Sequence, residues 1–113
     1  MGKEERREQM NIYISGSITN DPNFREKFRA AEIDIRDAGH VPFNPAEFNA
    51  DRNDGLNRNQ MMGNCFKLMD LCEAMYQLPD WENSKGALVE YGYALAKGMS
   101  IFDATTMMPT PER

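Results

Sequence analysis

The stretch PDWENSKGALVEYGYALAKG, residues 79–98, decides the fold. It leads from an apolar, strand-like run through a short polar loop into a helix. Asn83 or Ser84 is expected to cap that helix, because short polar side chains accept hydrogen bonds from the first backbone N–H groups. The remaining N–H groups and the positive end of the helix dipole then face whatever lies above the strand.

One face of this helix combines a single carboxylate with residues that have almost no side chain. Spacings of three and four bring four residues onto this face: Gly86, Ala87, Glu90 and Ala94. On periodicity alone, a lone glutamate in a helix is an ordinary helix former that faces water. The small neighbours indicate instead that the sheet or a ligand approaches closely.

Four short strand-like runs alternate with helical patterns along the chain. We expect strands at residues 11–15, 41–43, 74–78 and 100–102. Asp21 and Pro22 are expected to cap and start a helix that Gly39 ends, and a further helix is expected over residues 60–71. Residues 46–58 show little periodicity and are expected to form a long loop.

This alternation predicts an α/β fold. We expect a small parallel sheet of about four to five strands, with right-handed crossovers and helices on both faces. In the strand order 2-1-3-4, the first and third strands are neighbours. Ligands bind beyond the carboxyl ends of such strands, where the strand order reverses. The loops at residues 15–20 and 79–84 are therefore expected to meet at the binding edge.

Length and composition indicate one ordinary globular domain. The chain has 113 residues, of which 41% are hydrophobic, and a net charge of −5. We expect a single domain over residues 11–103, after a mobile lead-in at 1–10 and before an irregular tail at 104–113. The negative charge argues against a polynucleotide partner, because phosphate backbones are bound mainly by clustered Lys and Arg. A small anionic ligand is compatible with it, since backbone N–H groups can hold a phosphate.

The cysteines and the hydropathy pattern indicate a cytoplasmic protein. Cys65 and Cys72 are seven residues apart in one expected helix, about 10 Å along its axis, which is too far for a disulfide. His40 is the single histidine, and no Cys/His spacing fits a zinc site, so no metal is expected. Neither a signal peptide nor an apolar run of roughly 18 residues occurs, so no membrane partner is expected.

Three motifs resemble the nucleoside 2-deoxyribosyltransferase-like superfamily. They are YISGSI at residues 13–18, AGHVPFNPAE at 38–47 and CEAMYQLPDWENSKGALVEYGYALAKG at 72–98. The pattern W-E-x-S-x-G-A-x-x-E within the last motif is most similar to short phage and bacterial members of that superfamily. The similarity covers nearly the whole expected domain.

The resemblance implies a flavodoxin-like, Rossmann-like three-layer fold and chemistry at an N-glycosidic bond. By motif position, Glu90 is the nucleophile that attacks C1′ of the sugar, and Tyr13 orients it. The oxocarbenium-like transition state of such a reaction favours a carboxylate close to C1′. The resemblance also implies a homodimer or larger homo-oligomer, and no metal or organic cofactor.

Two features resemble the branch that hydrolyses deoxynucleoside 5′-monophosphates. Ser84, six residues before Glu90, matches a serine of that branch, whereas transferases of plain nucleosides tend to carry aspartate there. The Gly16-Ser17-Ile18 loop is similar to the phosphate-holding loop of the same hydrolases. Across the motifs, the expected substrate-binding residues are Ser15, Gly16, Ser17, Ile18, Asn44, Trp81, Ser84 and Gly86. Trp81 can stack on a base or sugar, or can cap the core.

One position departs from the superfamily pattern. Counting eight residues back from Glu73 reaches Cys65, where an aspartate that assists the leaving base or the ribose hydroxyls is expected. A thiol supplies no fixed negative charge, so another acid, Asp80 or Glu82, would have to act. We therefore expect an N-glycosidase or transferase acting on a small nucleotide or nucleoside. The alternative is a nucleotide-binding protein with little or no turnover, which sequesters or senses a nucleotide metabolite.

Overall fold

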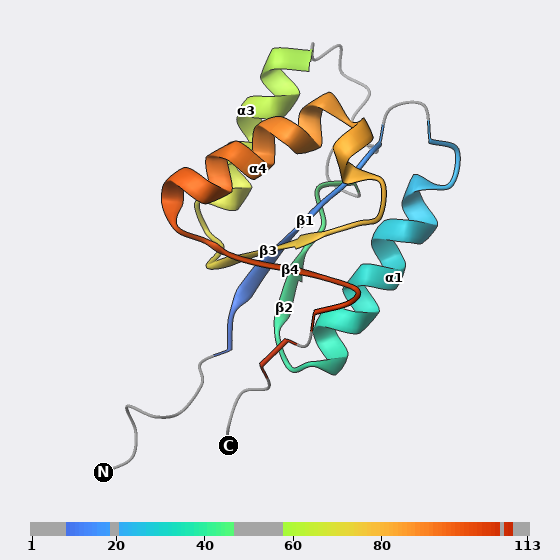
Figure 1. Ribbon diagram of the computed structural model, residues 1–113, viewed down its shortest axis with the longest axis vertical. Helices are drawn as coiled ribbons and strands as arrows, with labels where there is room; N and C mark the ends of the chain where they lie inside the picture. Colours follow the sequence, from blue (N-terminus) through green and yellow to red (C-terminus); the bar gives the residue numbers. More distant parts are fainter. Residues whose placement is uncertain (1–8, 19–20, 47–57, 107, 110–113) are drawn as a thin grey trace.

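The computed structural model describes residues 9–18, 21–46, 58–106 and 108–109 (Figure 1). Most of the lead-in expected at residues 1–10 and of the loop expected at 46–58 lies outside these described residues. The same holds for much of the expected tail, 104–113. Its described part includes Pro109, whose carbonyl group contacts Nε2 of the buried His40.

The described residues form one parallel sheet of four strands. In chain order these are β1 (Asn11–Ser15), β2 (Val41–Phe43), β3 (Ala74–Gln77) and β4 (Ser100–Asp103). They are arranged as β2-β1-β3-β4, and all three pairings are parallel. The predicted α/β class and the strand order 2-1-3-4 are therefore confirmed. The bounds of β1 and β2 match the expectation, while β3 ends one residue earlier and β4 one residue later.

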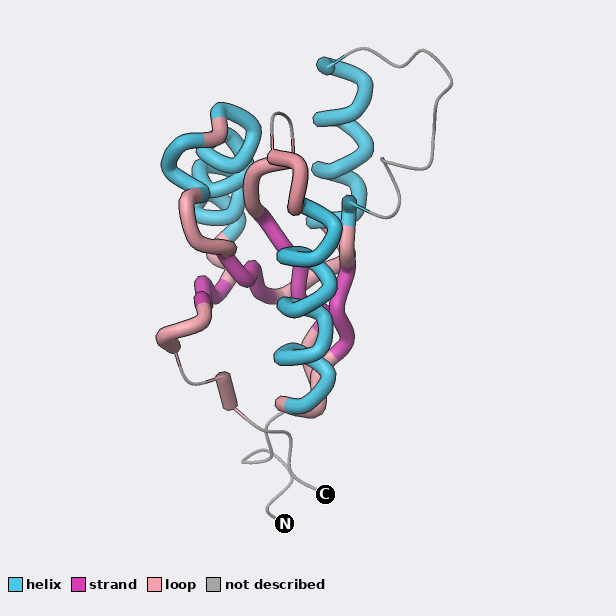
Figure 2. Tube along the Cα trace, turned by 90° about the vertical axis from the view of Figure 1, so that its right-hand side faces the viewer, coloured by secondary structure: helices cyan, strands magenta, loops and turns pink. Residues whose placement is uncertain are grey.

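Helices cover both faces of the sheet. In Figure 1, α1 (Phe24–Asp37) lies on one side of the strands, and α3 (Arg58–Met69) and α4 (Lys85–Lys97) lie on the other; Figure 2 shows α1 in front of the strands. None of the helices among the described residues has the length and apolar character needed to cross a membrane.

The two-residue period of β1 divides the core into two halves. Ile12 and Ile14 pack in the half that holds the α1 residues Phe28, Ala31 and Ile35. Tyr13, between them, packs in the other half, together with Met69 of α3 and Ala94 of α4. Because alternate strand residues point to opposite faces, the side chain of Ser15 lies on the same side as Tyr13, toward α4.

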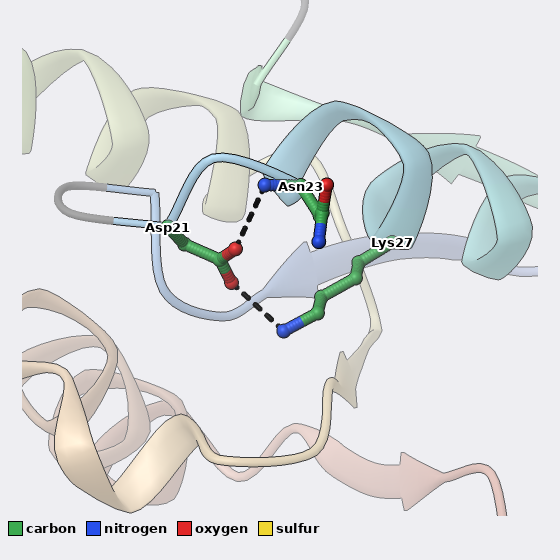
Figure 3. Close-up of polar contacts among 3 residues, drawn as sticks. All are labelled: Asp21, Asn23 and Lys27. Atoms are coloured by element: carbon green, nitrogen blue, oxygen red, sulfur yellow. Dashed lines mark hydrogen bonds and ion pairs between the residues drawn. The ribbon is translucent and has the colours of Figure 1, made fainter.

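The start of α1 differs from the expectation. The helix begins at Phe24 with Asn23 as its N-cap, so the predicted cap at Asp21 is wrong by two positions. The Asp21 carboxylate instead accepts a hydrogen bond from the Asn23 backbone N–H at 2.9 Å and pairs with Lys27 at 2.9 Å (Figure 3). Aspartate favours this local bond because its short side chain reaches the backbone N–H two residues on.

The helix α3 lies two residues earlier than predicted, so Cys72 is beyond its end. The Asn11 side chain donates to the Leu71 carbonyl at 2.9 Å, and Glu73 accepts from the Asn11 backbone N–H at 2.7 Å. These bonds to β1 hold the chain between α3 and β3 in a non-helical conformation. The expectation that Cys65 and Cys72 share one helix was wrong, although no disulfide joins these two buried residues.

Gly16 sits where the loops after β1 and β3 touch. A Cβ atom added at Gly16 would lie 2.7 Å from Leu78 Cδ1 and 2.8 Å from Leu78 Cβ. Leu78 is itself buried and bonded through its backbone N–H to the Ser15 carbonyl at 2.9 Å. The two loops therefore meet at the carboxyl edge of the sheet because residue 16 has no side chain.

We predict that Gly16→Ala lowers the free energy of unfolding by about 1–3 kcal/mol, since Leu78 has to move away from the new methyl group. The matched control is Gly92→Ala in α4, where an added Cβ meets no atom within 4 Å. That variant should gain up to about 1 kcal/mol, because alanine favours the helix. Urea denaturation of both variants measures the difference, and equal shifts would contradict the close contact at Gly16.

Candidate active site

Glu90 presents its carboxylate to the carboxyl half of β1. The Tyr13 hydroxyl donates to Glu90 Oε2 at 2.8 Å, and the Ser15 hydroxyl donates to Glu90 Oε1 at 2.7 Å. The Glu90 residue is only 6% exposed. Each carboxylate oxygen therefore has one fixed donor and retains further lone pairs that can face a ligand.

The local sequence explains why this helix can approach the sheet so closely. The buried residues of α4 are Ala87, Glu90 and Ala94, one turn apart on the same face. Tyr13 and Ser15 are two residues apart, so both point from β1 toward α4. Small side chains on either side of Glu90 leave its carboxylate within reach of both hydroxyl groups.

Burial dominates the electrostatics of this cluster. The pKa of Glu90 is raised above its ordinary value because burial penalises the charged form, although hydrogen bonds from Ser15, Tyr13 and Cys65 favour the charge. Burial, followed by the nearby Glu90 charge, raises the pKa of Tyr13 well above its ordinary value. Tyr13 is therefore a protonated donor at neutral pH, and the carboxylate is held by neutral groups.

Cys65 is the third neighbour of this carboxylate. The thiol on α3 is in hydrogen-bonding contact with both Tyr13 and Glu90. An aspartate of the superfamily pattern was expected at this position, and that correspondence stays a prediction. The group beside Glu90 is a thiol in this chain.

The N-terminus of α4 lies at the carboxyl edge of the sheet. Ser84 is the N-cap, as one of the two expected alternatives, and its hydroxyl oxygen accepts from the Ala87 backbone N–H at 3.2 Å. Before it, Asp80 adopts a left-handed conformation (φ 69°) that starts the short 3-10 helix η2 (Trp81–Asn83). Aspartate tolerates this conformation better than most residues.

The chain belongs to the family described as a domain of unknown function, DUF4406, which matches residues 10–103. Its structure is similar to that of a 2-deoxyribosyltransferase from the psychrotolerant bacterium Bacillus psychrosaccharolyticus. The TM-score is 0.64 at 19% identity, covering 87% of this chain and 75% of that chain. No protein with a curated description matches the chain.

These comparisons confirm part of the resemblance seen in the motifs. The chain has the fold of a 2-deoxyribosyltransferase, as the motifs predicted. The assignment to the short phage and bacterial branch, and the likeness to the monophosphate hydrolases, stay predictions.

Other expected site residues have local partners. Trp81 packs against Tyr91, with ring centroids 4.8 Å apart. The Asn44 side chain accepts from the Ala46 backbone N–H at 2.9 Å, and Ile18 packs against the α1 half of the core. Gly86 faces Met62, whose methyl group would lie 3.3 Å from an added Cβ. Their roles in binding remain predictions.

The two candidate acids, Asp80 and Glu82, are exposed in the segment just before the N-terminus of α4. The charge of Asp80 is the smallest of the contributions that raise the pKa of Lys27 on α1. Glu82 is an exposed residue of η2. Among the described residues, no group of three or more His, Cys, Asp or Glu side chains could hold a metal ion.

Sequence reasoning did not single out Gln77, and it did not foresee that Ser15 bonds to Glu90. Gln77 ends β3 directly opposite Ser15 in the parallel register, and it is only 6% exposed. One signal could have identified Gln77. It is a polar residue two positions after Met75, on a buried strand that lies where the strand order reverses. Ser15 was expected to bind substrate, whereas its hydroxyl donates to Glu90; a direct contact with substrate stays a prediction.

We predict that Glu90→Gln raises the free energy of unfolding at pH 7 by on the order of 1 kcal/mol. Replacing a buried active-site group often stabilises a protein while it lowers activity. The raised pKa means that the folded state binds the Glu90 proton more readily than the unfolded state does. The wild type therefore loses stability as the pH rises from the ordinary value of 4.5 through the raised folded value. At pH values below this range, Glu90 is protonated in both the folded and the unfolded state. The variant should then be no more stable than the wild type.

Urea denaturation at a series of pH values measures this difference. Glu26→Gln is the control, because Glu26 is exposed on α1, on the opposite face of the sheet. Its neutralisation should change stability by less than about 0.5 kcal/mol at every pH. A Glu90→Gln variant that is less stable than the wild type at pH 7 would contradict the prediction.

Proposed function

We propose that this protein breaks the N-glycosidic bond of a small nucleotide, with the Glu90 carboxylate as the nucleophile. The proposal depends above all on one observation: a buried carboxylate oriented by two hydroxyl groups at the carboxyl edge of β1. The shared fold with a 2-deoxyribosyltransferase supports it. This edge is also where parallel α/β sheets bind ligands.

The proposed reaction takes two displacement steps. A Glu90 carboxylate oxygen forms a bond to C1′ while the C1′–N bond breaks, and the bonding electron pair leaves with the base, which takes up a proton. Water, or a second base, then attacks C1′ and releases the Glu90 carboxylate. Tyr13 and Ser15 keep the carboxylate aimed in both steps, and the buried surroundings strengthen its attraction for positive charge that develops at C1′.

Two elements near Glu90 support a phosphorylated substrate. The first backbone N–H groups of α4 lack intrahelical acceptors, and the helix dipole favours an anion there. The Gly16 loop lies against Leu78 at the same edge of the sheet. Ser84 already accepts a bond from Ala87, and its hydroxyl hydrogen can still be donated to a phosphate oxygen.

We also propose that the protein acts as a homodimer or larger homo-oligomer. Three apolar residues of α4 are about half exposed: Leu88, Val89 and Leu95. Apolar side chains gathered on one exposed helix are typical of a surface that another subunit covers.

The proposal predicts that the wild type releases free base from at least one 2′-deoxynucleoside 5′-monophosphate and that Glu90→Ala does not. Loss of a nucleophile should lower kcat by about a thousandfold or more. Chromatography of the reaction mixtures detects the base, and Glu26→Ala serves as the control with unchanged rate. Equal release by the wild type and Glu90→Ala would exclude Glu90 as the nucleophile.

The alternative is a nucleotide-binding protein with little turnover, and Cys65 is the observation that favours it. A thiol contacts Glu90 where the superfamily pattern has an aspartate, so a fixed charge and a strong acid are absent from this position. Under this alternative a nucleotide raises the melting temperature, while no base is released.

We predict that Cys65→Asp distinguishes the two functions. If the chain is a binder or a weakened enzyme, the new carboxyl group should raise turnover by about 100-fold, the usual contribution of one acid or base, with little change in affinity. Cys65→Ser is the control, since it keeps a hydrogen-bonding group without a charge. Efficient turnover by the wild type, reduced by both substitutions, would exclude the alternative.

A further inference from the structure

Gln77 lies beside the Glu90 cluster. In the parallel register it stands between Ser15 of β1 and Asp103 of β4. Paired residues of neighbouring strands point to the same face of a sheet, so the Gln77 side chain is directed toward the α4 side, as Ser15 is. Its residue is 6% exposed, which places an amide group inside the protein at the carboxyl edge of β3.

This amide group lacks a hydrogen-bond partner. In the part of the chain that the structure describes, Gln77 Nε2 is the one buried side-chain nitrogen or oxygen atom without a partner. Both neighbours in register have partners elsewhere. The Ser15 hydroxyl donates to Glu90, and the Asp103 carboxylate accepts from Thr105 and Thr106 in the turn after β4.

An unpaired buried donor is rare in folded proteins because desolvating it without a new bond destabilises the fold. A methionine or leucine of similar size would fill the same volume without that cost. The unpaired amide of Gln77 destabilises the ligand-free fold, and Gln77 lies opposite Ser15, which donates to Glu90. Such a residue is typical of a group kept for a bound molecule.

We propose that Gln77 is a substrate-binding residue whose Nε2 donates a hydrogen bond to an acceptor oxygen or nitrogen of the substrate at the Glu90 site. This inference rests on the proposed function and adds a specificity-determining contact to it. The acceptor belongs either to the sugar or to the base. A neutral amide suits this position, because it recognises an acceptor without adding a charge that would pair with the Glu90 carboxylate.

The first test compares Gln77→Met with Tyr76→Phe without ligand. Tyr76 is the preceding residue on the same strand, and its hydroxyl donates to Asp34 at 3.0 Å on the opposite, α1 face. Gln77→Met should raise the urea midpoint of the ligand-free protein, because it removes an unpaired polar group. Tyr76→Phe should lower the midpoint, because it removes a bond that is made. A lower midpoint for Gln77→Met would show that the amide is structural and overturn the inference.

The second test measures dissociation constants of the same variants. The probes are the four 2′-deoxynucleoside 5′-monophosphates and 2-deoxyribose 5-phosphate. Gln77→Met should weaken binding by about three- to tenfold, the value of one hydrogen bond, while Tyr76→Phe should leave it unchanged. A loss that extends to 2-deoxyribose 5-phosphate assigns the acceptor to the sugar. A loss restricted to intact nucleotides assigns it to the base.

The outcomes separate this inference from the proposed function. If the wild type binds these probes and Gln77→Met binds them equally well, Gln77 is not a binding residue and the proposed function stands. If the wild type binds none of them and releases no base, the proposed function fails, and the role of Gln77 fails with it.

Discussion

A carboxylate buried between a helix and a sheet needs hydrogen-bond donors in place of the water it has lost. Glu90 obtains two of them from β1, and this constraint shapes the elements around it. The helix must come close enough for Tyr13 and Ser15 to reach the carboxylate, so its inner face is built from Ala87 and Ala94. These donors are neutral hydroxyl groups, and their hydrogen bonds favour the charged form of Glu90 against the burial that raises its pKa.

The parallel topology brings the parts of this site together. The first and third strands pair directly, although their residues are about sixty positions apart in the chain. Two loops begin at the carboxyl ends of these strands, at one edge of the sheet. The loops are in contact where Gly16 packs against Leu78. The crossover connections place α1 on one face and α3 with α4 on the other, so Cys65 and Glu90 reach Tyr13 from two helices on the same side.

Several residues around Glu90 make the fold less stable than it could be. Glu90 is a buried titratable group, Gln77 has an unpaired amide nitrogen, and Asp80 holds a left-handed backbone conformation. Each is unfavourable by itself, and all three belong to elements at the carboxyl edge of the sheet. Departures from the rules of stable packing tend to gather where a protein binds or reacts. Their proximity gives a reason, independent of the family resemblance, to look for function at this edge.

The sequence by itself determined the local elements and the strand order. Apolar runs defined β1 and β2 to the residue, Ser84 was an expected cap, and the small residues around Glu90 indicated a close approach. Periodicity, capping and turn chemistry act over a few residues, so they can be interpreted directly. They failed at the C-terminal end of α3, where the distant Asn11 bonds to the Leu71 carbonyl and to the Glu73 side chain. Only the tertiary structure decided that Ser15 donates to Glu90 and that Gln77 stays unpaired, because both depend on strand register and on how α4 lies across the sheet.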